Sequence, residues 1–184
     1  MSPPGRPKGE YRSAQHEGTP VRAAPSRWKP VAVAAAAALF VAMLGGLMTD
    51  IGPWYLSLKQ PPWKPPDWAF GPVWTTIFAL AAAAGVIGWR HAASKAECEL
   101  QWLLFALNGF LNVLWSLLYF RLHRPDWALF EVPFLWLSVL ALIVVLRRSS
   151  ATAAWLLVPY LVWVAIAALL NWQTVQLNGP FAAA

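Results

Sequence analysis

The sequence predicts an all-α membrane protein, built as a bundle of five transmembrane helices with a first loop, rich in Pro and Trp, as its lid. Of the 184 residues, 59% are hydrophobic and only 12% are charged, whereas a soluble domain carries about 25% charged residues. The apolar residues also fall into separated blocks, each of roughly the length that crosses a hydrocarbon layer of ~30 Å as a helix. We therefore expect a single helical bundle in a membrane.

The first two predicted spans, residues 31–48 and 73–89, carry no charged side chain. The first span places small residues at intervals of four, which lets a neighbouring helix approach closely. These residues are Ala34, Ala38, Ala42 and Gly46. Packing within the same bundle is preferred over a seam between two copies as the interpretation of this stripe.

The remaining three spans contain a few polar residues. Residues 100–120 and 151–172 carry no charge, whereas residues 127–146 contain Glu131 and Pro133 within about two turns of their start. An acid at that depth can reach the interface, so we expect Glu131 to lie near the lipid headgroups. The segment therefore remains the fourth predicted span.

Composition divides the chain into three regions. Residues 1–29 are rich in Pro, Gly, Ser and charge and have almost no large aliphatic side chains, which predicts a disordered basic tail. An organellar targeting peptide is the alternative, because this segment holds several Arg and only two acids. Residues 30–178 are expected to form the five-helix domain, and residues 179–184 a short C-terminal tail.

Basic residues are distributed unevenly between the two ends of the predicted helices. An excess of Lys and Arg beside apolar spans reports topology, so we expect the N-terminus inside and no nucleic acid as a partner. We also expect a bacterial envelope membrane rather than an organellar outer membrane. Ten basic residues lie on the N-terminal side and four opposite: Arg6, Lys8, Arg12, Arg22, Arg27, Lys29, Arg90, Lys95, Arg147 and Arg148, against Lys59, Lys64, Arg121 and Arg124.

The first loop, residues 49–72, is crowded with Pro and aromatic side chains. Its prolines fix φ and bias each preceding residue toward extended conformations, so the loop is expected to be stiff and partly polyproline-like. Such a loop makes a good lid. The chain has 13 Trp, more than aromatic belts at ten span ends require, which favours a pocket lined by the deeper ones.

Tryptophan and amide side chains are expected to converge beneath this lid. With a rise of ~1.5 Å per residue, Asn112 and Trp115 lie about 18 and 22 Å along the third span, and Trp163 lies about 18 Å along the fifth. Trp74 starts the second span on the same side. Asn108 and Asn112 must face inward, where they either bond a neighbouring helix or line a cavity, because an amide facing lipid is costly.

The predicted pocket is aromatic, with a few amides and almost no charge. It suits a large, flat, mostly apolar ligand held by stacking and oriented by a few hydrogen bonds. Carboxylates of the ligand would meet Lys59 or Lys64 in the loop, unless these lysines are simply solvated. We expect no metal site and no required cofactor.

Three segments of the chain share a pattern with a known family. They are residues 54–75, WYLSLKQPPWKPPDWAFGPVWT, and parts of residues 107–116 and 156–171. Over roughly residues 31–178, the chain resembles the tryptophan-rich sensory protein and translocator protein family, TspO/MBR, which includes the peripheral-type benzodiazepine receptor. The resemblance implies a five-helix bundle, often a homodimer, that binds porphyrins such as protoporphyrin IX and haem in tetrapyrrole sensing, transport or removal.

The resemblance also implies roles for particular residues. Trp74 and Trp163 resemble pocket tryptophans implicated in porphyrin binding and breakdown. One departure is Trp172, which stands where the animal cholesterol motif has Tyr and is followed by no basic residue, so tight cholesterol binding is not expected. The full set of candidate ligand-binding residues is Tyr55, Trp63, Pro66, Trp74, Asn108, Asn112, Trp115, Ser116, Trp163 and Ala167.

Three functions compete at this point. A receptor or carrier for porphyrins is preferred. Conventional acid-base catalysis is not expected, because Glu131 is the only acid inside a predicted span, but light-dependent porphyrin breakdown needs only a bound chromophore and the oxidisable indoles of Trp74 and Trp163. An autonomous small-molecule transporter is disfavoured by the odd number of spans and the absence of an internal repeat.

Overall fold

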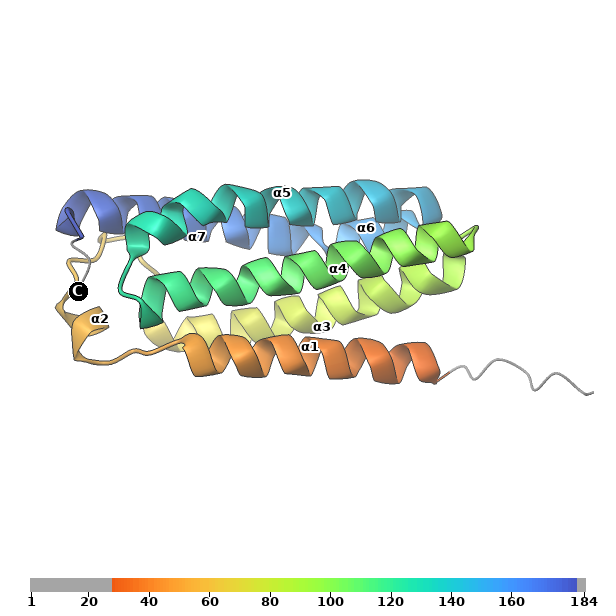
Figure 1. Cartoon of the computed structure of the whole chain (residues 1–184), viewed down its shortest axis with the longest axis horizontal. Coiled ribbons are helices and arrows are strands. Elements are labelled where there is room, and N and C mark those ends of the chain that lie inside the picture. Colours follow the sequence, from red (N-terminus) through yellow and green to blue (C-terminus); the bar gives the residue numbers. More distant parts are fainter. Residues whose placement is uncertain (1–27, 182–184) are drawn as a thin grey trace, which may run out of the picture.

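The computed structural model describes residues 28–181, so the predicted tail at residues 1–27 and the last part of the C-terminal tail, residues 182–184, lie outside the described residues. Five of its helical segments are long and apolar enough to cross a membrane, and they run up and down side by side (Figure 1). The predicted fold class is confirmed. The helices are α1 (Lys29–Met48), α2 (Pro53–Ser57), α3 (Asp67–His91), α4 (Lys95–Ser116), the π-helix η1 (Leu117–Arg121), α5 (Pro125–Ser149), α6 (Ala151–Leu156) and α7 (Val158–Asn178).

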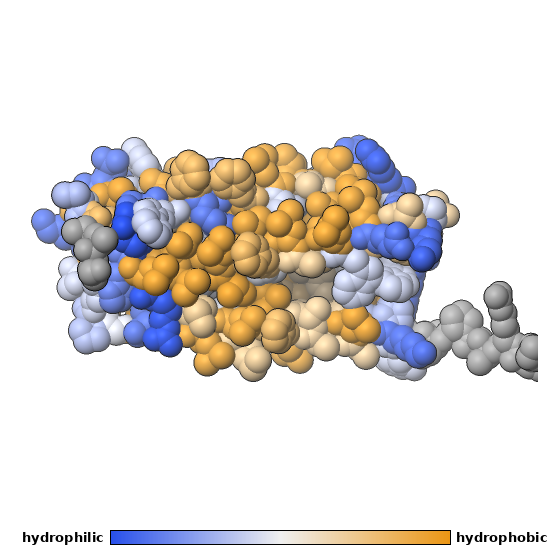
Figure 2. Space-filling model, in the orientation of Figure 1, coloured by the Kyte–Doolittle hydropathy of each residue, from blue (hydrophilic) through white to orange (hydrophobic). Residues whose placement is uncertain are grey.

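The outside of the bundle carries a broad apolar band between two hydrophilic ends (Figure 2). Large apolar side chains point outward along it, and Leu39, Phe110 and Phe130 are 70%, 63% and 77% exposed. Water would solvate such a surface poorly, whereas lipid tails solvate it well. The chain is therefore an integral membrane protein that crosses the bilayer several times.

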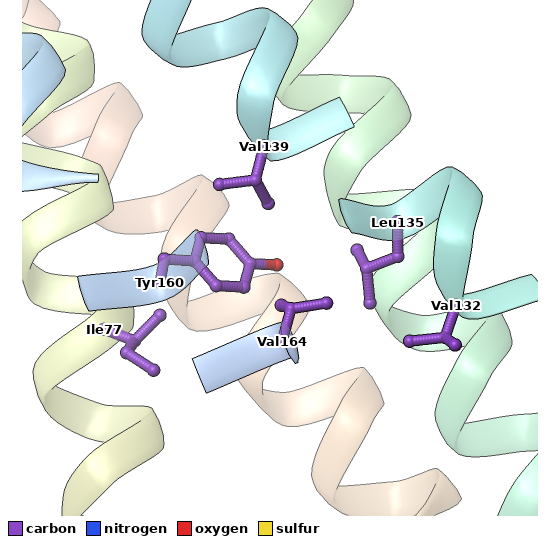
Figure 3. Close-up of a cluster of buried hydrophobic side chains, with 6 residues drawn as sticks. All are labelled: Ile77, Val132, Leu135, Val139, Tyr160 and Val164. Carbon is purple, nitrogen blue, oxygen red and sulfur yellow. The ribbon is translucent and has the colours of Figure 1, made fainter. Parts of the chain in front are cut away.

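Helix α5 lies at the centre of the packing and α1 at its edge. Nine residues of α5 are buried, whereas α1 has none. We call the largest group of buried apolar residues the central cluster, in which side chains of α3 and α7 face side chains of α5 (Figure 3). Its members are Ile77, Val132, Leu135, Val139, Tyr160 and Val164.

The first loop is shorter and more helical than predicted. Because α3 begins at Asp67, the connection from α1 covers residues 49–66, which we call the lid loop. A helix of one turn, α2, begins at Pro53 within it, since a fixed φ near −65° also suits the first turn of a helix. The Asn178 side chain holds the lid loop to the end of α7, accepting from the Lys59 N–H at 2.7 Å and donating to the Lys59 carbonyl at 2.9 Å.

Side-chain hydrogen bonds close the opposite end of the bundle. Ser94 and Glu97 form a capping box at the start of α4: the Ser94 hydroxyl accepts from the Glu97 N–H at 3.2 Å, and Glu97 accepts from the Ala93 N–H at 2.8 Å. Ser149 at the end of α5 donates to Glu97 at 2.5 Å and accepts from Gln101 at 2.9 Å. The ends of α4 and α5 are therefore bonded to each other.

Candidate ligand-binding site

Three tryptophans from three separate helices gather around the central cluster. Trp74 of α3, Trp115 of α4 and Trp163 of α7 all pack against it, and each is half-buried. The depths calculated from the sequence place these indoles at similar levels along the bundle. Their packing against the same cluster shows that they are also close to one another across the bundle. The indoles therefore surround one apolar centre in the half of the bundle that lies below the lid loop.

Ring contacts extend this group of indoles. Trp74 meets the Tyr160 ring edge to face, with centroids 6.0 Å apart, and Phe70 meets Trp163 in the same way at 5.6 Å. Trp115 stacks on Tyr119 at 5.1 Å. Such offset and edge-to-face pairs are the preferred arrangements of aromatic rings. Several aromatic ring faces are therefore close enough together to stack against one flat aromatic ligand.

The amides of α4 bond neighbouring helices. Asn112 donates to the Tyr160 hydroxyl of α7 at 3.1 Å, and Asn108 donates to the Ser138 hydroxyl of α5 at 2.8 Å. Ser116 bonds within its own helix, to the Asn112 carbonyl at 3.4 Å. Of the two roles left open by the sequence, interhelical bonding holds for both amides, and Asn108 in addition lines a cavity.

The other candidate residues lie in the lid loop and on α7. Tyr55 of the lid loop is buried in an aromatic cluster against which Trp115 also packs, and its ring lies 5.6 Å from that of Phe120. Trp63 and Pro66 are exposed on the lid loop. Ala167 is half-buried on α7 and belongs to none of the buried clusters. Ala167 lies one turn from Trp163 on the same face of α7, whereas Trp63 and Pro66 lie on the surface of the lid loop.

A polar clasp joins the lid loop to the start of α3. The Tyr55 hydroxyl donates to Asp67 at 3.0 Å, and the Lys64 ammonium group donates to the Tyr55 oxygen at 3.0 Å and pairs with Asp67. Burial raises the pKa of Tyr55 above its usual value. Burial alone would lower the pKa of Lys64, but its hydrogen bonds to Asp67 and Tyr55 outweigh this and raise it. Lys64 is thus engaged inside the protein, not poised for a ligand carboxylate.

This clasp predicts an alkaline opening of the lid loop. Both Lys64 and Tyr55 have a raised pKa in the folded state, so the stability they contribute is complete below their ordinary values of 10.5 and 10.0 and is lost as the pH rises through the folded values. A spin label at Leu56→Cys, in a Cys98→Ser background, should become more mobile above about pH 10.

Variants identify the cause of this change in mobility. Lys64→Met should make the label mobile already at pH 8, because the clasp is then incomplete at every pH. Lys95→Met is the matched control, because Lys95 forms an exposed ion pair with Glu99 at the opposite end of the bundle. If the mobility of the label changes neither with pH nor in Lys64→Met, the clasp does not hold the lid loop.

Glu131 faces the inside of the bundle. It is only 6% exposed, so its side chain does not reach the outer surface of the helices. Neither of its carboxylate oxygens has a hydrogen-bond partner among residues 28–181. It lies on the buried face of α5, next in sequence to Val132 of the central cluster. The sequence predicted how far along the span this carboxyl lies but not which way it faces, which follows from the packing of α5 at the bundle centre.

A cavity of about 480 Å³ lies between α1, α3 and α4, mainly on the side of the bundle away from the lid loop. Figure 2 shows a recess in the apolar band where α1 and α4 face each other. Ala34 and Ala38 of the small-residue stripe on α1 line this space, as do Ala81 and Gly85 of α3. Of the ten candidate residues, Asn108 alone lines it.

Comparison with known proteins agrees with this architecture. The model of the TspO/MBR family matches residues 32–177, which take in most of all five spans. The chain belongs to the TspO/MBR family. Tryptophan-rich protein TspO of Chlorobaculum tepidum is 39% identical over 130 residues, which cover 68% of this chain and 79% of that protein.

Other members of TspO/MBR are similar over the same region. Protein CrtK of Rhodobacter capsulatus is 36% identical over 136 residues, covering 72% of this chain and 83% of its own. Translocator protein of Ovis aries is 33% identical over 126 residues, covering 68% and 75%. Bacterial and animal members are thus both similar to this chain.

Three residues of this TspO/MBR chain contact the site or the lid loop, although the sequence did not predict them as site residues. Tyr160 joins the central cluster, contacts Trp74 and accepts the Asn112 hydrogen bond. Trp136 packs against the same cluster, and Asn178 holds the lid loop. Tyr160 precedes Trp163 by three positions on α7, a spacing that puts both on one helix face, so that spacing was available as a signal. Nothing in the sequence marks Asn178.

Proposed function

We propose that this TspO/MBR chain is a membrane receptor or carrier that binds porphyrins, such as protoporphyrin IX or haem, among Trp74, Trp115 and Trp163. The observation that carries the proposal is the packing of these three indoles, each from a different helix, around one apolar cluster. Porphyrins are the ligand class that the family resemblance implies. They are also large, flat and mostly apolar, which is what a ring-lined site selects.

A ligand that binds in this site replaces contacts that the indoles already make with other aromatic rings. The half-buried indoles now contact other rings, at 5.1 to 6.0 Å between centroids. A macrocycle that enters between Trp74 of α3 and Trp163 of α7 replaces those contacts with its own faces. The hydrogen-bonded pair of Asn112 and Tyr160 lies beside Trp74 and supplies polar groups that orient the guest.

The lid loop completes the arrangement. It is held at three places: by the clasp at Asp67, by the bond between Lys59 and Asn178, and by Trp54, which stacks on His123 with centroids 4.1 Å apart. A loop that is already ordered loses little conformational entropy when it covers a ligand. The lid loop therefore acts as a preformed cover whose release admits the guest.

Titration with protoporphyrin IX tests the proposal. The purified full chain in detergent should show saturable quenching of indole fluorescence. Trp163→Phe should weaken the affinity about three- to tenfold, because a smaller ring gives up part of the stacking contact. Trp74→Phe should have a similar effect, since its ring faces the same centre.

Trp155→Phe is the matched control for this titration. Trp155 is 72% exposed on α6, at the end of the bundle away from the lid loop, and its loss removes one indole from the signal without touching the site. An affinity equal to that of the wild type is expected. A titration that never saturates, or an equal loss of affinity in Trp155→Phe and Trp163→Phe, would overturn the proposed site.

A further inference from the structure

The cavity between α1, α3 and α4 lies beside the porphyrin site proposed above and shares Tyr160 with it, but none of the three indoles of that site lines it. It is lined at one end by Pro30 of α1 and Trp89 of α3, which lie at the start and near the end of their helices. It is lined at the other end by Leu44 and Phe78. The distance from Pro30 to Leu44 along α1 is about 21 Å. The cavity is therefore elongated and runs parallel to the helices, from one end of the bundle past its middle.

The lining of the cavity offers few polar groups to an occupant. It consists mainly of alanines, aromatic rings and aliphatic side chains. The two amides that line it already have partners, because Gln101 donates to Ser149 and Asn108 donates to Ser138. Ordered water needs two to four polar partners, so water alone fills such a space poorly. An extended hydrocarbon chain fits both the shape and the chemistry.

Basic and aromatic residues lie at the end of this cavity that Pro30 and Trp89 line. Lys29 directly precedes Pro30, Arg90 directly follows Trp89, and both basic side chains are exposed. Trp89 and Trp102 meet edge to face at 5.3 Å there, and indoles of this kind favour the headgroup level of a bilayer. Positive charge at that level attracts anionic lipid headgroups. The surroundings of the cavity thus match an amphiphile with an apolar tail and a negative head.

We propose that this cavity binds one acyl chain of an anionic phospholipid, whose headgroup lies at Lys29 and Arg90. A second copy of the chain is a poorer occupant, because an apolar helix face brings no negative group to Lys29 and Arg90. The lipid chain lies between α1 and the rest of the bundle and takes the place of a helix–helix contact there.

Lipid retention measures this binding directly. The full chain is reconstituted in nanodiscs with equal amounts of phosphatidylglycerol and phosphatidylcholine, released into mild detergent and examined by native mass spectrometry. One retained phosphatidylglycerol per chain is expected, at least about fivefold more frequent than retained phosphatidylcholine. Ala38→Phe, which fills the cavity from α1, should abolish retention. Ala36→Phe is the matched control, because Ala36 is exposed and does not line the cavity.

Two further measurements separate loss of lipid binding from misfolding and from dimer formation. Lys29→Gln leaves the cavity intact and should remove the preference for phosphatidylglycerol over phosphatidylcholine. Ala38→Phe should bind protoporphyrin IX as the wild type does, which also shows that this variant is folded. Equal retention in Ala38→Phe and Ala36→Phe would overturn the proposal. The proposal would also be wrong if Ala38→Phe lost porphyrin binding but kept the lipid. It would equally be wrong if the wild type were a dimer without lipid and Ala38→Phe converted it to monomers, because a second copy would then be the occupant.

Discussion

Substituting valine for Gly88 is expected to lower the free energy of unfolding by about 1–3 kcal/mol, through overpacking. Gly88 of α3 is buried between α4 and α5. A Cβ atom there would overlap with the end of the Leu146 side chain and come within 3.0 Å of the Gln101 oxygen. Leu146 is 0% exposed, so its side chain must change rotamer within the core to make room, and crowding of this kind is destabilising. Titration of the micelle-bound protein with sodium dodecyl sulfate measures the loss of stability.

Gly46→Val separates this steric effect from the general cost of valine in a helix. Gly46 lies on α1, and an added Cβ would meet no atom within 4 Å. The stability of Gly46→Val should therefore stay close to that of the wild type. If both variants lose equal stability, the close packing at Gly88 is not what limits the side chain at that position.

Substituting leucine for Asn171 is expected to cost about 1–3 kcal/mol of stability, because two hydrogen bonds between α7 and the main chain of α5 are lost, at about 0.5–1.5 kcal/mol each. Asn171 of α7 is 1% exposed. With its amide nitrogen facing α5, it donates to the Pro125 carbonyl at 2.9 Å and accepts from the Leu129 N–H at 3.0 Å. Leucine has a similar volume but cannot bond either group. The same detergent titration measures this change.

Asn108→Leu gives the comparison for Asn171. Asn108 is also a buried amide, but its partner Ser138 keeps a second hydrogen bond, to the Leu135 carbonyl at 2.7 Å. Losing one side-chain bond between membrane helices costs only about 0.6 kcal/mol on average. Asn171→Leu should thus be clearly the less stable of the two. A larger loss in Asn108→Leu would show that the bonds of Asn171 to α5 add little.

The five spans were predictable because the bilayer sets their length and composition. Their ends were less so. The sequence places the second span at residues 73–89, yet α3 begins at Asp67, because a helix continues past the hydrocarbon layer wherever its caps and contacts allow. Likewise, the proline-rich loop was predicted to be stiff and partly polyproline-like, and the helical turn that Pro53 starts in it was not foreseen.

The gathering of Trp74, Trp115 and Trp163 was also within reach of the sequence, because helical rise fixes depth and helical period fixes the face. The bond between Lys59 and Asn178 was not, since these residues are separated by 119 positions. Local patterns carry no information about such a contact. The burial of Glu131 belongs to the same class, because it depends on which helix occupies the centre of the bundle.

The edge position of α1 contrasts with its place in the order of synthesis. α1 leaves the ribosome before the other spans, yet it contributes no buried side chain, whereas α5 contributes nine. Order of synthesis and degree of burial therefore run in opposite directions: the span made first leaves all of its side chains at least partly open to lipid, whereas the fourth span fills the interior.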